Sequence, residues 1–134
     1  MVSANTLCKN VLNVKNTVIE NFNLYSDEDG MKHIRIKARP NKWHENNCPF
    51  CHKSCPVYDK HSSRPTIWRG LDWGGILVEV EYQTHRLICP EHGVYVAEVP
   101  WAYPCSRFTK DFDLTAAWFA SYLPRSTTSY FMRV

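Results

Sequence analysis

Apolar and polar residues alternate in the first third of the chain, which is typical of half-buried β-strands. Residues 18–24 alternate in part, residues 27–30 form a turn signal, and residues 33–39 alternate cleanly. The apolar face of the second run carries Ile34, Ile36 and Ala38. We therefore predict a β-hairpin that ends at Pro40.

A second region of alternation predicts further strands. Residues 66–69 suit a short strand, and Gly70 with the pair at 74–75 suits a turn region. Residues 76–88 are predicted to form one long strand, and residues 94–99 another. The shared apolar face of the long strand comprises Ile76, Val78, Val80 and Tyr82.

The period becomes helical from residue 108 onward. An apolar stripe recurs at steps of three and four residues: Phe108, Phe112, Ala116, Phe119 and Leu123. Thr109 suits the N-cap position, Pro124 ends this helix, and residues 125–134 suit a cap followed by a second helix. A helix pair with a short polar joint is typical of the start of a helix-turn-helix. The predicted fold class is α+β.

Length and charge allow several classes of protein. The chain has 134 residues, 22% of them charged, and a net charge of +3, which suits one ordinary domain or two small ones. This mild basic charge permits nucleic-acid binding without establishing it. One predicted strand face is basic and is either solvated or directed at phosphates; it carries His33, Arg35, Lys37 and Arg39.

Two distant pairs of metal-type ligands carry the strongest chemical signal. Cys48 and Cys51, and then Cys89 and His92, each have ligand-x-x-ligand spacing with Pro after the first Cys. Four such ligands complete a tetrahedral structural zinc site. Closing the loop of roughly 37 residues between the pairs costs about 3 kcal/mol, whereas structural zinc contributes on the order of 10–16 kcal/mol. We therefore predict that these four residues bind zinc.

The alternatives to metal binding are that these cysteines form disulfides or are buried free thiols. Cys55 lacks the paired spacing, so we predict that it is not a ligand, although His52 and His61 lie nearby in sequence. The start at residues 1–6 has neither the charged nor the apolar part of a signal peptide, and no apolar run is long enough to span a membrane. These features predict a cytoplasmic protein, in which paired cysteines bind metal more often than they form disulfides.

Several short motifs follow one another from Cys48 to the end of the chain. They are the first ligand pair, residues 68–72 (Trp-Arg-Gly-Leu-Asp), residues 86–90 (Arg-Leu-Ile-Cys-Pro), residues 100–102 (Pro-Trp-Ala) and residues 106–109 (Ser-Arg-Phe-Thr). In this order the segment resembles the amino-terminal region of bacterial insertion-sequence transposases of the ISL-three family. The resemblance implies a zinc finger, ligated by the same four residues, followed by a helix-turn-helix. The family usually has Cys where this chain has His92.

In that family a catalytic domain follows the helix-turn-helix. No carboxylate cluster here matches a two-metal nuclease site. We therefore expect no catalytic residues and no DNA cleavage or joining by this chain, which would be a fragment or the product of a truncated element. The predicted division is an amino-terminal segment with a hairpin (1–47), a small zinc-ribbon-like β-hairpin module that binds zinc (48–100), and the helical start of a helix-turn-helix (101–134).

The leading functional hypothesis is a module that binds double-stranded DNA at element ends. The predicted DNA-contacting residues lie around the two helices: Arg107, Lys110, Arg125, Ser126, Thr128 and Arg133. The alternative is a protein-interaction or self-association module, in which some of the five Trp side chains serve as anchors.

Overall fold

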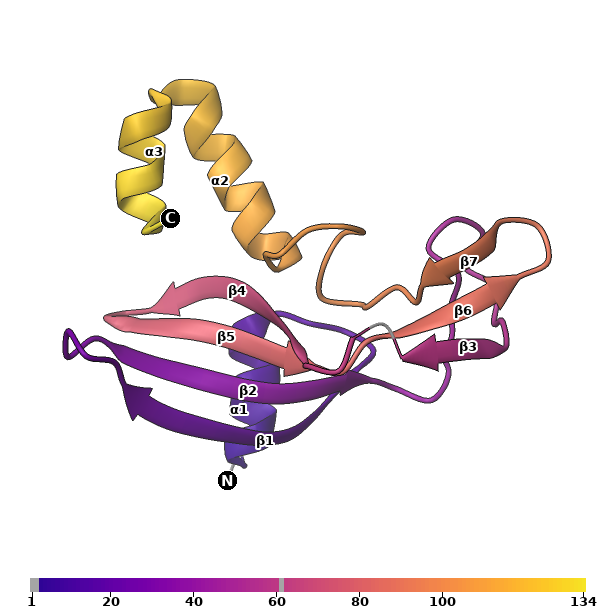
Figure 1. Ribbon diagram of the computed structural model, residues 1–134. Helices are drawn as coiled ribbons and strands as arrows, with labels where there is room; N and C mark the ends of the chain where they lie inside the picture. The colour runs from indigo at the N-terminus through magenta and orange to yellow at the C-terminus, as the bar shows by residue number, and fades with distance from the viewer. Residues whose placement is uncertain (1–2, 61) are drawn as a thin grey trace.

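The computed structural model describes residues 3–60 and 62–134. Met1, Val2 and His61 lie outside the described residues, so the predicted lack of a signal peptide at the start falls partly outside them too. The elements, in order, are α1 (Ala4–Leu12), β1 (Thr17–Ser26), β2 (Lys32–Pro40), β3 (Val57–Lys60), β4 (Thr66–Trp73), β5 (Ile76–Tyr82), β6 (His85–Cys89), β7 (Gly93–Val96), α2 (Lys110–Tyr122) and α3 (Arg125–Met132) (Figure 1). The predicted α+β class is confirmed.

Four strands form one sheet in the order β1-β2-β5-β4 (Figure 1). The predicted hairpin is confirmed as the antiparallel pair β1–β2. Strand β2 also pairs with β5 in parallel, with Ile34 opposite Val78 and Ile36 opposite Val80. This sheet joins strands from both sides of Cys48, whereas the division of the chain at residues 47 and 100 stays a prediction.

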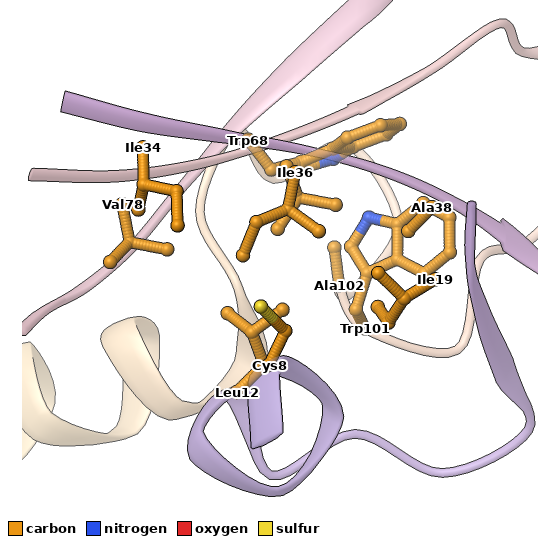
Figure 2. Close-up of a cluster of buried hydrophobic side chains, with 11 residues drawn as sticks. Cys8, Leu12, Ile19, Ile34, Ile36, Ala38, Trp68, Val78, Trp101 and Ala102 are labelled. Carbon is orange, nitrogen blue, oxygen red and sulfur yellow. The ribbon is translucent and has the colours of Figure 1, made fainter. Parts of the chain in front are cut away.

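The first hydrophobic core lies under one face of this sheet (Figure 2). Ile36 and Val78 are fully buried, as the alternation predicted. Trp101, which follows the last strand, lies among them and meets Trp68 edge to face at 5.4 Å between ring centroids. The segment between the strands and the helices is thereby anchored to the sheet.

Helix α1 was missed by the sequence analysis. Ser3 caps its amino terminus by accepting a hydrogen bond from the backbone N–H of Thr6. Cys8 and Leu12, four residues apart, are the side chains that it buries against the core (Figure 2). The Ser3 cap and the four-residue spacing were the signals for this helix in the sequence. Two buried positions only one helical turn apart are too short a pattern to predict it.

The prediction of one long strand over residues 76–88 is wrong. The chain breaks at Gln83 and Thr84, so that β5 stays in the first sheet and β6 joins a second sheet of order β3-β6-β7. Gln83 donates its side-chain N–H to the carbonyl oxygen of Ser62 at 2.6 Å. The break allows Leu87 and Cys89 to enter a separate buried cluster, to which an unbroken strand would not deliver them.

Gly70 was predicted to lie in a turn, but it lies inside β4. A Cβ at this position would stand 3.3 Å from Val78 Cγ1 and 3.6 Å from Thr109 Cγ2. The bare backbone of Gly70 therefore lets the start of α2 approach the sheet closely. Gly74, at φ +60, does serve the predicted turn.

The helix pair occurs where the sequence predicts it. Thr109 caps α2 by accepting a hydrogen bond from the backbone N–H of Phe112 at 3.4 Å. Phe112 is the fully buried residue of the apolar stripe, and the other members of that stripe are half-buried. Leu123 and Pro124 join α2 to α3 (Figure 1).

Candidate metal centre

Two tight turns carry the paired Cys and His residues. In the first turn the backbone N–H of His52 donates to the carbonyl oxygen of Cys48 at 2.9 Å, and that of Cys48 donates to the carbonyl of Lys53 at 3.0 Å. The second turn joins β6 to β7, with Cys89 opposite Gly93 in the strand pairing. Gly93 has φ +86, a backbone conformation that L-residues rarely adopt. The second sheet thus holds one turn, and backbone hydrogen bonds close the other.

The structure brings Cys48, Cys51, Cys89 and His92 together, with their ligand atoms all within 4.8 Å of one another. The Sγ atoms of Cys51 and Cys89 are 3.8 Å apart. His92 Nδ1 lies 3.5 Å from Cys89 Sγ and 3.7 Å from Cys48 Sγ.

These spacings fit a tetrahedral zinc ion. With Zn–S near 2.3 Å and Zn–N near 2.0–2.1 Å, two sulfurs should lie about 3.8 Å apart, and a sulfur and a nitrogen about 3.6 Å apart. The three distances given above depart from these values by about a tenth of an ångström. The donor set and its geometry therefore suit zinc as a closed site with four protein ligands.

The electrostatics of the cluster favour a thiolate at Cys89. A hydrogen bond from His92 lowers the pKa of the Cys89 thiol to about 6, because it stabilises the negative sulfur. A thiolate is the form of cysteine that ligates a metal. Cys48 and Cys89 are buried while His92 is exposed, so the cluster lies just beneath the surface.

Cys55 lies beside the cluster but outside the group of four. Its thiol points at the carbonyl oxygen of Lys53, 3.4 Å away. Burial, together with a hydrogen bond to Cys89, raises the pKa of Cys55 to about 11, which keeps this sulfur protonated. His52 likewise points elsewhere, with Nδ1 2.8 Å from Glu98 Oε2. That Cys55 does not ligate metal stays a prediction.

Two aromatic side chains that sequence analysis did not single out support the second turn. The Phe50 ring lies 5.2 Å from the His92 ring and meets Tyr95 edge to face at 4.6 Å. Phe50 is the third residue of the first ligand pair, so its ring links the two turns directly. Its place inside the Cys-x-x-Cys sequence was the only signal for this role.

The six predicted DNA-contacting residues differ in their exposure and in their contacts with the rest of the protein. Arg107, Arg125 and Ser126 are exposed, and Lys110 is half-buried with its ammonium 5.4 Å from the Tyr103 ring centroid. Thr128 is buried, and its hydroxyl has no hydrogen-bond partner among the described residues. Arg133 is exposed, but its Nε lies 3.4 Å from a carboxylate oxygen of Asp72.

The basic strand face of β2 proves to be partly neutralised. Arg35 forms an ion pair with Glu79 at 2.6 Å. His33 lies between two carboxylates, with Nδ1 2.6 Å from Glu79 and Nε2 2.8 Å from Asp27. The adjacent strand β5 supplies Glu79, a partner that the sequence of β2 alone did not reveal. His33 and Arg35 are thus engaged by carboxylates, which disfavours phosphate binding by this part of the face.

Fold and site together define a small α+β chain with a Cys₃His cluster of zinc-like geometry and a carboxyl-terminal helix pair. None of the helices in the described part of the chain has the length and apolar character needed to cross a membrane. No family model matches the chain, and no solved structure matches it.

The chain is similar to the transposase for insertion sequence element IS1557 from two strains of Mycobacterium tuberculosis, CDC 1551 and H37Rv. In both cases 34% of residues are identical over 122 residues, which is 90% of this chain. The chain spans about 27% of the length of these curated relatives.

Proposed function

We propose that this chain is a zinc-stabilised, non-catalytic DNA-binding region of a bacterial insertion-sequence transposase of the ISL-three type. It helps to recognise the element ends and works in the cytoplasm. The observation that carries the proposal is the 34% identity, over 90% of the chain, to a protein described as the transposase of an insertion sequence element. The Cys₃His cluster adds a physical basis for the zinc.

Zinc in this scheme is structural. Cys48, Cys51, Cys89 and His92 would fill all four positions, which leaves no open position for a reacting water. The ion would hold the two turns together and complete the small second core, to which Leu87 contributes. Zinc thus shapes the scaffold and takes no part in chemistry.

The helix pair supplies the proposed DNA surface. Arg125 and Ser126 begin α3 and are exposed, so they suit phosphate contacts at a helix amino terminus. Arg107 and Lys110 flank the amino-terminal cap of α2 in the same way. With α3 as the reading helix, the pair would be the start of a helix-turn-helix. Burial of Thr128 and the Arg133–Asp72 ion pair make these two residues weaker contacts.

Binding to duplex DNA as a function of salt tests the proposal. Three or four phosphate contacts give a log–log salt slope of roughly −3 to −4. Replacing Arg107 and Lys110 together by Ala should lower affinity equally on all sequences and flatten the slope by about 2 units. Lys60→Ala on β3, far from the helix pair, serves as the matched control. Binding that ignores salt, or that survives the double substitution, would reject this surface.

One observation favours the alternative of an interaction or self-association module. The helix pair exposes Trp118, Tyr122, Tyr130 and Phe131, with exposed fractions of 60%, 73%, 80% and 59%. Exposed aromatic clusters of this kind often mark protein interfaces. Sedimentation over a range of protein concentrations, without DNA, decides between monomer and oligomer. Self-association in the absence of DNA binding would favour this second function.

A further inference from the structure

A groove with a volume of about 840 Å³ lies between β4, the end of β7 and the segment of residues 97–107. Figure 1 shows this segment leaving β7 and continuing to α2. Three aromatic rings line the groove and remain partly exposed: Phe50 by 55%, Tyr95 by 44% and Tyr103 by 42%. The groove therefore offers ring faces and edges to a flat ligand.

Charge in the groove favours an anion. Arg64 and Arg107 both line it and are exposed. Among the described lining residues the acidic one is Glu98, and it already pairs with His52 at 2.8 Å. The groove is thus positive at two places, and its one carboxylate is engaged elsewhere.

The aromatic rings are held in place before any ligand arrives. Phe50 and Tyr95 pack edge to face at 4.6 Å, and Phe50 also contacts the His92 ring of the proposed metal centre. Tyr103 is contacted by the ammonium of Lys110 at 5.4 Å. Rings that are already ordered lose little entropy when a flat ligand stacks on them.

Rings and arginines together match the chemistry of nucleic acid with unpaired bases. Intact duplex DNA hides its base faces in the stack, so it cannot use ring surfaces in this way. We propose that the groove binds an unpaired segment of DNA, with bases stacking on Phe50, Tyr95 and Tyr103 and phosphates contacting Arg64 and Arg107. This inference rests on the proposed DNA-binding function and adds to it a preference for unpaired strand.

The test compares three fluorescent DNAs with the zinc-loaded chain: a blunt duplex, the same duplex with a single-stranded tail, and the tail alone. The tailed duplex should bind about tenfold more tightly than the blunt one, which is the size expected of one stacked base. A 2-aminopurine in the tail should lose fluorescence on binding because stacking quenches it. A purely electrostatic contact would not change this signal.

A double substitution in the groove separates the contribution of the groove to DNA binding from that of the helix pair. Arg64→Ala with Tyr103→Ala should cut the tail advantage severalfold and weaken the 2-aminopurine quenching, because Phe50 and Tyr95 alone remain for stacking, and leave blunt-duplex affinity within about twofold. Tyr103→Phe should retain both, because the ring face remains. Tyr58→Ala is the control, since Tyr58 is a 55% exposed ring on β3 outside the groove.

Equal affinity for blunt and tailed duplex would overturn the groove inference while leaving the proposed duplex binding intact. A tail advantage that the double substitution leaves unchanged would also overturn it. Failure to bind any of the three DNAs would reject the proposed function itself.

Discussion

The guanidinium of Arg69 donates a hydrogen bond to the backbone carbonyl oxygen of Arg133 at 2.9 Å, so a side chain of β4 holds the end of α3. The same group donates to the carbonyl of Met132 at 3.2 Å and to Asp72 at 3.1 Å. A cation suits the negative end of a helix. The Trp-Arg-Gly-Leu-Asp motif thereby joins the sheet to the helix pair.

Arg69→Ala should release α3 from the sheet. Hydrogen bonds from a charged group contribute about 1.5–3 kcal/mol, and we expect a loss of that size in the free energy of unfolding. Amide hydrogen exchange should rise more in α3 than in β2, because α3 also gains a local opening. Asp72→Asn is the matched variant: it removes the ion pairs of Asp72 with Arg69 and Arg133 but keeps both contacts of Arg69 with the helix carbonyls, so it should cost about 1 kcal/mol or less. Equal effects of the two substitutions would contradict this role of Arg69.

Cys89→Ser should abolish stoichiometric zinc binding, because it removes one of four ligands from a site whose spacing fits the ion. Metal analysis after dialysis should find about one zinc per parent chain. Cys55→Ser is the control within the same small core, and it should keep both the zinc and the fold. Metal loss in the control would instead place Cys55 in the site and remove His92 from it.

Removal of zinc should unfold the second sheet and spare the first. From the spacing of the ligands alone, zinc removal would be expected to unfold the whole strand region between the two ligand turns. The structure limits the expected unfolding to β3, β6 and β7, because β4 and β5 belong to the first core around Trp68 and Val78. Amide exchange with and without a chelator measures the difference. Equal loss of protection in β2 and β6 would show that the two cores unfold as one unit.

Much of the first sheet was predictable because apolar and polar residues alternate along its strands and one face of the sheet is buried. Ile34, Ile36 and Ala38 in β2 are buried as the pattern requires. The break after Tyr82 was not predictable, because the alternation hardly changes across Gln83 and Thr84 while the sheet partners do. Pairing partners depend on long-range contacts, which a local pattern does not contain.

The ligand cluster was predictable for a different reason. Ligand-x-x-ligand spacing is a local property of one turn, and two such turns were present in the sequence. The surroundings of the cluster were not predictable in this way. Phe50 reaches His92, and Arg69 reaches Arg133, only because the fold brings distant segments together.

The ring of His33 lies between the carboxylates of Asp27 and Glu79. The hydrogen bond to Asp27, followed by that to Glu79, raises the pKa of His33 above its ordinary value, although partial burial opposes this. Tyr25 stacks on the ring at 4.9 Å, and Arg35 shares Glu79 with it. The imidazolium is therefore the form that the fold stabilises.

The sign of the pH dependence follows from this raised pKa. The stability from His33 is fully present below the unfolded pKa of about 6.5 and is lost as pH rises through the higher folded pKa. We expect His33→Gln to lower the free energy of unfolding by about 1.5–3 kcal/mol near pH 5.5, and by less near pH 9. His44→Gln, which loses a contact with Asn41 rather than with carboxylates, is the control. Urea unfolding at both pH values measures each difference against the parent chain, which cancels the pH dependence of the metal centre. A His33→Gln penalty that is equal at both pH values, or larger at high pH, would show that a neutral ring suffices in this position.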